Sequence, residues 1–291
     1  MKALLKDVSF SRICGLFGKS RQAWYDIRQR DTDQDLEESL VLGWVRDIRM
    51  ELPRVGTIKL YHMLKPQLQA HQIKLGRDGL YRLLAAHDML IQRRKKRVYT
   101  TDSRHQFRKW PNLVTGLAVN RPDQLWVSDI TYLTTEKGFL YLSLITDAYS
   151  RKIVGYHLSQ HLKATGCISA LQKAIKCRQT PLQQLIHHSD RGIQYCCDGY
   201  VSILQRQFIN ISMTQSGSPY DNALAERVNG ILKQEFGLDR RFASYKLAVE
   251  PVAKAIHAYN YLRPHLSCGL QTPDKVYYLG IENSLSSQIS N

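Results

Sequence analysis

Two aspartates lie in segments that otherwise predict buried β-strands. Asp129 lies within "QLWVSDITYL", and Asp190 closes the apolar segment "QLIHHSD". Burying a lone carboxylate is costly unless it is paired with a cation or coordinates a metal ion. Taken singly, each acid also fits a structural role, paired with an arginine or capping a turn. Their chemistry therefore depends on which other groups join them.

A third acid, Glu226, is separated from Asp190 by 35 intervening residues and lies in "SPYDNALAERVNGILKQEF", which predicts a helix. Ser218 is a plausible N-cap and Pro219 fits the first helical position. At about 100° per residue, one side of this helix is apolar. Its members are Leu224, Val228, Ile231 and Leu232, and the opposite side carries Asn222, Glu226, Asn229, Gly230 and Lys233. This polar side is either a solvated face or part of a site.

The elements that must position the acids change character at about residue 123. Three β-rich segments follow one another, "QLWVSDITYL", "GFLYLSLITDAYS" and "RKIVGYHLS". Then come a helix ("KATGCISALQKAIKCR"), the short strand "QLIHH", a helix over about 194–207, the strand "NISMT" and the Glu226 helix. This order predicts an α/β layer fold with a mixed sheet. Ligand groups gather at strand ends in such sheets.

Up to about residue 97, the segments before the sheet are predicted to be helical, apart from an acidic linker at 31–39. We divide the chain into a helix-turn-helix-like segment with an acidic linker (1–39), a helical region with a basic end (40–100), a linker (101–122), the sheet-containing core (123–240) and a C-terminal helix and tail (241–291). A small helix pair at the start fits DNA binding or an ordinary helical hairpin. The 40–100 region ends in five cations expected to contact phosphates, Arg93, Arg94, Lys95, Lys96 and Arg97.

The charge of the chain indicates a polyanionic partner. Lys and Arg total 41 against 25 Asp and Glu, so the net charge is +16 and the pI about 9.6. The surplus favours nucleic acid or an anionic membrane surface. A bilayer-spanning run and a signal sequence are both missing, which argues against the membrane. Six cysteines without a CxxC pair suggest reduced cytosolic thiols.

Four motifs together carry a family resemblance: "WVSDITYL", "HHSDRGIQY", "SPYDNALAERVNGILKQE" and the late "YNYLRPHLSCGLQTP" (259–273). As a set they resemble the second-reading-frame (OrfB-like) transposases of bacterial insertion sequences, within the superfamily of DDE transposases and retroviral-type integrases. The resemblance covers about residues 40–278. It implies a ribonuclease H-like fold, a mixed five-stranded sheet flanked by helices and preceded by an all-helical region.

The resemblance also implies an activity, that of a polynucleotidyl transferase cutting insertion-sequence ends and transferring strands. Asp129, Asp190 and Glu226 would be catalytic and would hold two Mg²⁺ ions, with Mn²⁺ as a substitute. Such a metal pair activates a nucleophilic oxygen, neutralises the phosphate and stabilises the leaving oxygen. Lys233 would contact DNA near the site. Arg191, Arg227 and Asn222 flank the acids and fit either DNA contacts or structural roles.

The expected partners are double-stranded DNA, namely element ends and target, and further copies of the chain on that DNA. A protein from an upstream reading frame, fused or separate, is another expected partner. The expected place is the bacterial cytoplasm, at the nucleoid. Two other functions remain open: a non-catalytic DNA-binding regulator derived from a transposase, and a metal-dependent nuclease that stops at hydrolysis.

Overall fold

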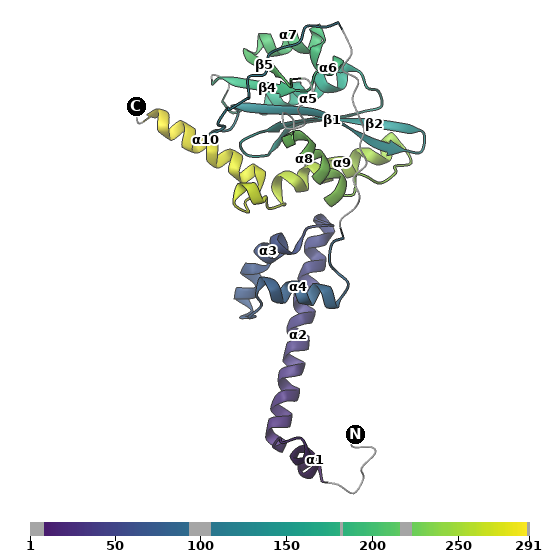
Figure 1. The fold of residues 1–291 in the computed structure, drawn as a ribbon, viewed down its shortest axis with the longest axis vertical. Helices are drawn as coiled ribbons and strands as arrows, with labels where there is room; N and C mark the ends of the chain where they lie inside the picture. The colour runs from purple at the N-terminus through teal and green to yellow at the C-terminus, as the bar shows by residue number, and fades with distance from the viewer. Residues whose placement is uncertain (1–8, 93–105, 181–182, 216–222, 290–291) are drawn as a thin grey trace. The chain divides into compact units, whose positions relative to one another are not determined.

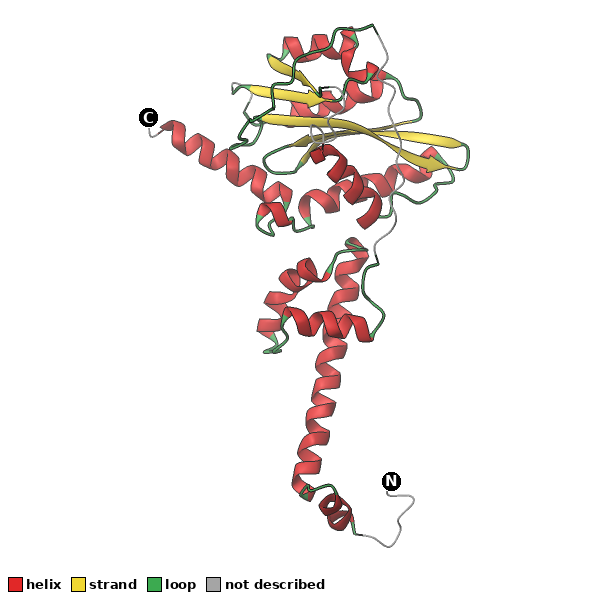
Figure 2. Cartoon of the chain, in the orientation of Figure 1, coloured by secondary structure: helices red, strands yellow, loops and turns green. Residues whose placement is uncertain are grey.

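The computed structural model describes residues 9–92, 106–180, 183–215 and 223–289. The chain divides into two compact units. One comprises Met1–Met50 and Gly56–Leu90, and the other Glu51–Val55 and Ile91–Asn291. The first is helical and the second contains the sheet (Figures 1 and 2). Among the described residues, no helix has the length and apolar character needed to cross a bilayer.

The helical unit contains α1 (Phe10–Leu16), α2 (Arg21–Glu51), α3 (Thr57–Ala70) and α4 (Arg77–Ala86). The expected turn between the first two helices is confirmed, because Gly18 has a φ of +66° and the Ser20 hydroxyl accepts from the Ala23 amide at 3.0 Å. Apolar residues spaced three or four apart form the interior of this unit. They include Val41, Val45, Leu60, Leu64, Leu80 and Leu84.

The acidic linker expected at residues 31–39 is instead part of α2. Side-chain hydrogen bonds one turn apart run through this stretch, from Gln29 to Asp33 at 2.9 Å and from Gln34 to Glu38 at 3.0 Å. Such i, i+4 pairs stabilise a helix. The acidic composition favours a linker, but these local side-chain pairs stabilise a helix through the stretch.

The expected mixed five-stranded sheet is confirmed. Its strands are β1 (Leu125–Thr135), β2 (Gly138–Asp147), β3 (Ile153–Ser159), β4 (Leu185–Ser189) and β5 (Ile209–Met213), in the spatial order β3-β2-β1-β4-β5. The pairs β1/β2 and β2/β3 are antiparallel, whereas β1/β4 and β4/β5 are parallel. The parallel β1/β4 pair places the carboxyl end of β4 beside the first half of β1, because Ser189 lies opposite Ser128.

Helices cover both faces of the sheet (Figure 1). One apolar cluster joins Trp126 and Ile145 to α5 (Ala164–Cys177), α6 (Ile193–Cys196) and α7 (Asp198–Arg206). Another joins Leu133, Leu142 and Leu144 to α8 (Ala223–Glu235) and α9 (Tyr245–Tyr261). Side chains alternate between the faces of a strand. Odd-numbered β1 residues such as Leu133 therefore face α8 and α9.

Three expected boundaries differ from the structure. The single helix expected over 194–207 is two helices, α6 and α7, because Cys197 has an extended backbone. The single C-terminal helix is also two, α9 and α10 (Pro273–Ile289), separated by Pro264 and a short 3-10 turn. The expected linker packs on the core through Val114, Leu117 and Val119.

Candidate active site

Asp129 lies at an odd position of β1 and so faces α8. Its Oδ1 accepts a hydrogen bond from the Ile130 amide at 2.9 Å, and its Oδ2 accepts one from Asn229 Nδ2 on α8 at 2.7 Å. Burial raises the pKa of this carboxyl to about 7, and the neighbouring charges of Asp190 and Glu226 add to the increase. The strand position thus places a poorly solvated acid beside two other acids.

Asp190 is the first residue after β4. The parallel register pairs Ser128 with Ser189, so the two aspartates are the next residues on adjacent strands. The Gly192 amide donates to Asp190 Oδ1 at 2.9 Å. A Cβ on Gly192 would lie 3.0 Å from that oxygen and 3.1 Å from Gln194 Oε1. Glycine therefore leaves the Asp190 carboxylate room in this tight turn.

Glu226 lies in the first turn of α8 and is exposed. The amphipathic character expected for its helix is confirmed, since Val228, Ile231 and Leu232 are buried in the core cluster. Asn229, one turn after Glu226, is 7% exposed and bonds to Asp129. The polar face of α8 therefore turns toward Asp129 on β1, and it is more than a solvated surface.

Lys233 lies two turns after Glu226 and is half-buried. Burial lowers the pKa of its ammonium group, while the nearby Asp129 charge acts in the opposite direction. The cation is therefore close enough to Asp129 to interact with it electrostatically. This places Lys233 beside the carboxylates, where a phosphate backbone would also require positive charge.

The chemistry of these groups fits a hard divalent cation. Three carboxylates gather here, and their mutual repulsion contributes to the raised pKa of Asp129. The buried Asn229 Oδ1 has no hydrogen-bond partner among the described residues. Among the described residues, no group of three or more His, Cys, Asp or Glu side chains lies close enough together to hold one metal ion. Mg²⁺ is typically bound by one or two carboxylates, with water and substrate phosphate as its other ligands.

The other expected site residues are distributed differently. Arg191 is half-buried beside Asp190, and Arg227 is exposed on α8. Asn222 and the five cations at 93–97 lie outside the described residues. His187 is buried between Ser128 Oγ at 2.6 Å and Tyr200 OH at 2.9 Å, and burial lowers its pKa to about 3. A neutral, enclosed His187 belongs to the core and does not supply a proton to the site.

One functional candidate was missed from the sequence, namely the Asn229 contact with Asp129. The signal was its position on the same helical face as Glu226. A spacing can place Asn229 on that face, but it cannot show which strand residue the amide reaches.

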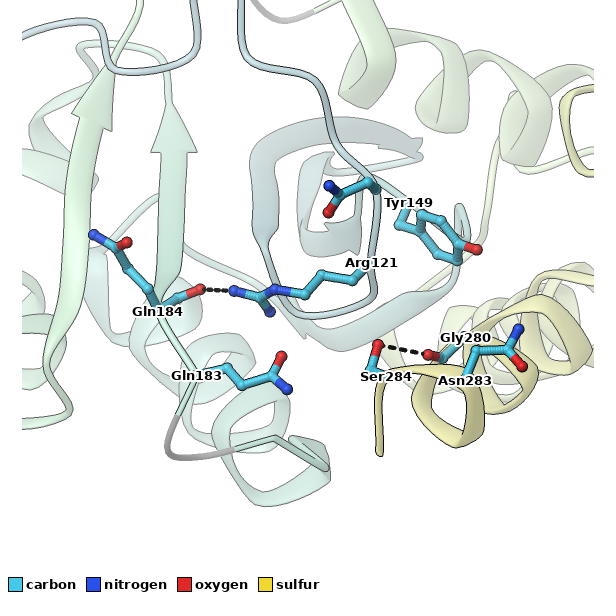
Figure 3. Close-up of a pocket in the computed structure, with 8 residues that line it drawn as sticks. Arg121, Tyr149, Gln183, Gln184, Gly280, Asn283 and Ser284 are labelled. Atoms are coloured by element: carbon cyan, nitrogen blue, oxygen red, sulfur yellow. Dashed lines mark hydrogen bonds between the residues drawn. The ribbon is translucent and has the colours of Figure 1, made fainter. Parts of the chain in front are cut away.

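A separate polar pocket lies elsewhere on the sheet unit (Figure 3). Its wall includes Arg121, whose guanidinium donates to the Gln184 carbonyl at 2.6 Å, and residues of α10 such as Asn283. Asp129, Asp190 and Glu226 are not among the residues that line it. The carboxylate cluster is therefore the candidate active site, and it lies outside this pocket.

Comparison with known proteins identifies the family of the chain. Two family models, both described as "Integrase core domain", match residues 119–219 and 207–273. The transposase for insertion sequence element IS629 of Shigella sonnei is 33% identical over 244 residues, which are 81% of each chain. The chain belongs to the insertion-sequence transposases of the second-reading-frame type. Members of this integrase-core family are polynucleotidyl transferases that depend on divalent metal ions.

Other relatives cover the chain to different extents. A 31 kDa protein of insertion element IS600 from Shigella sonnei is 32% identical over 265 residues, 90% of this chain and 96% of that protein. Transposase InsF of IS3A from Escherichia coli K12 is 37% identical over 155 residues, 53% of this chain and 54% of InsF. The catalytic core of HTLV-2 integrase with magnesium matches 54% of this chain and 97% of its own, with 20% identity and a TM-score of 0.43.

The raised pKa of Asp129 predicts a pH dependence of stability in the metal-free transposase. Between about pH 4 and pH 7 this carboxyl ionises in the unfolded chain while it stays protonated in the folded chain. The folded state then binds more protons, so its stability falls as the pH rises through this window. From pH 4 to pH 8, we expect the free energy of unfolding of wild type to fall by about 2–4 kcal/mol more than that of Asp129→Asn.

Urea unfolding at pH 4 and pH 8 in a chelator measures this difference. Asp147 is the internal reference, because burial raises its pKa to about 6 in both proteins and its contribution cancels. Parallel pH profiles of wild type and Asp129→Asn would contradict the prediction.

Proposed function

We propose that this chain is a DNA transposase that cuts the ends of its insertion sequence and transfers the freed strands to target DNA. The observation that carries the proposal is the gathering of Asp129, Asp190 and Glu226 from β1, the end of β4 and α8. Asp190 and Glu226 lie 61 and 97 positions after Asp129 in the sequence. The three acids come together only because β4 lies beside β1 in the sheet and α8 packs against that sheet. The membership of the transposase family supports the same reading.

In this proposal the three carboxylates hold two Mg²⁺ ions, for which Mn²⁺ substitutes. The ions would activate the attacking oxygen, neutralise the phosphate and stabilise the leaving oxygen. Asp129, Asp190 and Glu226 would be the protein ligands of these ions. Asn229 holds one Asp129 oxygen at 2.7 Å and thereby orients this carboxylate.

The reaction would use two successive nucleophiles at the same site. Water first breaks a phosphodiester bond at the element end and frees a 3′-hydroxyl. That hydroxyl then attacks a phosphate of another strand and displaces a new 3′-oxygen. In each step one oxygen, of water or of the 3′-hydroxyl, bonds to phosphorus while a 3′-oxygen leaves it. The protein therefore forms no covalent intermediate.

Cations around the acids would bind the rest of the DNA. Lys233, Arg191 and Arg227 would contact phosphates near the site, together with Asn222. The helical region 40–100 with Arg93–Arg97 would bind DNA away from it, and residues 1–39 would assist. Lys and Arg contacts of this kind make DNA affinity fall steeply with salt. Residues 123–240 would form the catalytic core and 241–291 would support it.

The complex would contain more than one copy of the chain, since two element ends must be held together. A protein from an upstream reading frame, fused or separate, would supply further end recognition. Such an assembly would act at the bacterial nucleoid, where target DNA is found.

A strand-transfer assay tests the proposal. Labelled DNA carrying the element ends is incubated with target DNA and Mg²⁺ or Mn²⁺, with and without a chelator and with the upstream-frame protein supplied. We expect joined products that need the metal. Cut but unjoined DNA would instead indicate a nuclease, and salt-sensitive binding without cutting would indicate a DNA-binding regulator.

Replacement of Asn229 tests its part in the site. Asn229→Ala removes the donor to Asp129 Oδ2, so we expect the half-saturating metal concentration for cleavage to rise about 10–100-fold. Gln234→Ala, a half-buried residue of the same helix, is the matched control and should behave as wild type. Unchanged metal dependence in Asn229→Ala would remove this residue from the proposed machinery.

A further inference from the structure

The late motif "YNYLRPHLSCGLQTP" has no role in the chemistry described so far. Three of its first five residues point into the protein: Tyr259, Asn260 and Arg263 are 0%, 5% and 2% exposed. Their neighbour Tyr261 is 47% exposed. Two buried polar side chains and a buried tyrosine at the end of α9 must each find partners.

Arg263 binds Glu235, the last residue of α8. Its Nε and one terminal nitrogen each donate to a separate carboxylate oxygen at 2.7 Å, which is a bidentate pair. The Arg263 guanidinium also lies 5.8 Å from the centre of the Tyr259 ring. This contact joins the end of α9 directly to the end of the helix that carries Glu226.

The same segment is anchored on the sheet. The Asn260 amide group accepts from the Ile153 amide and donates to the Ile153 carbonyl, both at 2.9 Å. The Tyr259 hydroxyl donates to the Arg151 carbonyl at 3.0 Å. Since Ile153 begins β3, the end of α9 forms a bridge from the sheet to α8.

A buried ion pair is a poor way to gain stability alone, because desolvation of both charges offsets their attraction. It fixes one geometry, however, since the bidentate contact is lost if either helix shifts. The first half of α8 lies beside the carboxylates. Asn229 donates to Asp129, and Glu226 lies one turn before Asn229. An axial shift of α8 would therefore displace Glu226 relative to β1.

We propose that Arg263 is a positioning residue: through Glu235 it locks the end of α8 to the sheet and thereby sets the place of Glu226 opposite Asp129. The motif 259–263 is then a clamp: Asn260 binds the first residue of β3, Tyr259 binds Arg151 just before that strand, and Arg263 binds α8. Its effect on catalysis rests on the proposed transposase function, whereas its effect on α8 does not.

The test compares three proteins in hydrogen–deuterium exchange and in metal titration of end cleavage. The first is the double variant Arg263→Met with Glu235→Leu, which removes both charges and leaves no unpaired one buried. The second is Arg263→Lys, which keeps the charge and loses the fork. The third is the control Lys254→Met with Glu250→Leu, which removes an exposed pair on α9.

In both Arg263 variants we expect α8 amides to exchange about 10-fold faster while those of α5 stay unchanged. At a temperature where circular dichroism shows full folding, the half-saturating metal concentration should rise about 10-fold, as for loss of a residue that orients a ligand. The control should match wild type in both measurements.

Equal acceleration in α8 and α5 would assign the pair to global stability and overturn the proposal. Unchanged α8 exchange would overturn it as well, and so would faster α8 exchange with unchanged metal dependence. If wild type itself cleaves no DNA, the proposed function fails, and the exchange measurement still decides whether the clamp holds α8.

Discussion

Asp129→Asn, Asp190→Asn and Glu226→Gln are each expected to lower end cleavage and strand joining by at least about 10³-fold, equal to about 4 kcal/mol of transition-state stabilisation. Each substitution replaces a charged oxygen by an amide, which is a much weaker partner for a hard divalent cation. Asp190 and Glu226 are the acids whose charges raise the pKa of Asp129. Single-turnover cleavage and joining assays on labelled element ends measure the loss.

DNA affinity should not fall in these variants, because each removes negative charge that repels phosphates. Glu136→Gln is a suitable control, since Glu136 is an exposed acid in the turn after β1. It should leave both rates within about 2-fold of wild type, a change below about 0.5 kcal/mol. Near-normal joining by any of the three carboxylate variants would exclude that residue as a metal ligand.

Gly155→Ala is expected to destabilise the sheet unit by about 3 kcal/mol, which is the upper end of the range for overpacking a core. Gly155 lies on β3 directly under α5, and an added Cβ would meet the Ala170 carbonyl oxygen and lie 2.9 Å from both Ala174 N and Ala174 Cβ. These are backbone or short side-chain atoms that cannot rotate away. The whole helix would have to move from the sheet.

Urea unfolding followed by circular dichroism measures this loss. Gly230→Ala serves as the comparison, because Gly230 is inside α8 and an added Cβ meets no atom within 4 Å. That substitution should stabilise the protein by about 0.5–1 kcal/mol, since alanine is the better helix former. Equal stability of Gly155→Ala and wild type would show that α5 does not pack on β3 as described.

Much of the core was predictable because its signals are local. Alternation of apolar residues gives β1 and β2 directly, and a mixed sheet follows from three successive strands followed by alternating helices. The face of α8 that carries Glu226, Asn229 and Lys233 follows from helical periodicity alone. Asp129 and Asp190 stood out because acids are rare inside apolar strands.

Segments without a strong periodic signal were predicted less well. Residues 31–39 were expected to be a linker and are helical, because pairs such as Gln34 and Glu38 stabilise the helix despite its acidic composition. The break at Cys197 between α6 and α7 has no proline or glycine to mark it. In both cases the outcome depends on small local terms that composition does not reveal.

The sequence by itself determined which residue types are available and on which face of its own strand or helix each one lies, because periodicities of 2 and 3.6 are properties of the backbone. Only the tertiary structure decided which faces meet. The contacts of Asn229 with Asp129, of Arg263 with Glu235 and of Gly155 with α5 each join residues distant in the chain. Such contacts depend on the strand order and on how α8 and α5 pack across the sheet, and no local pattern encodes that packing.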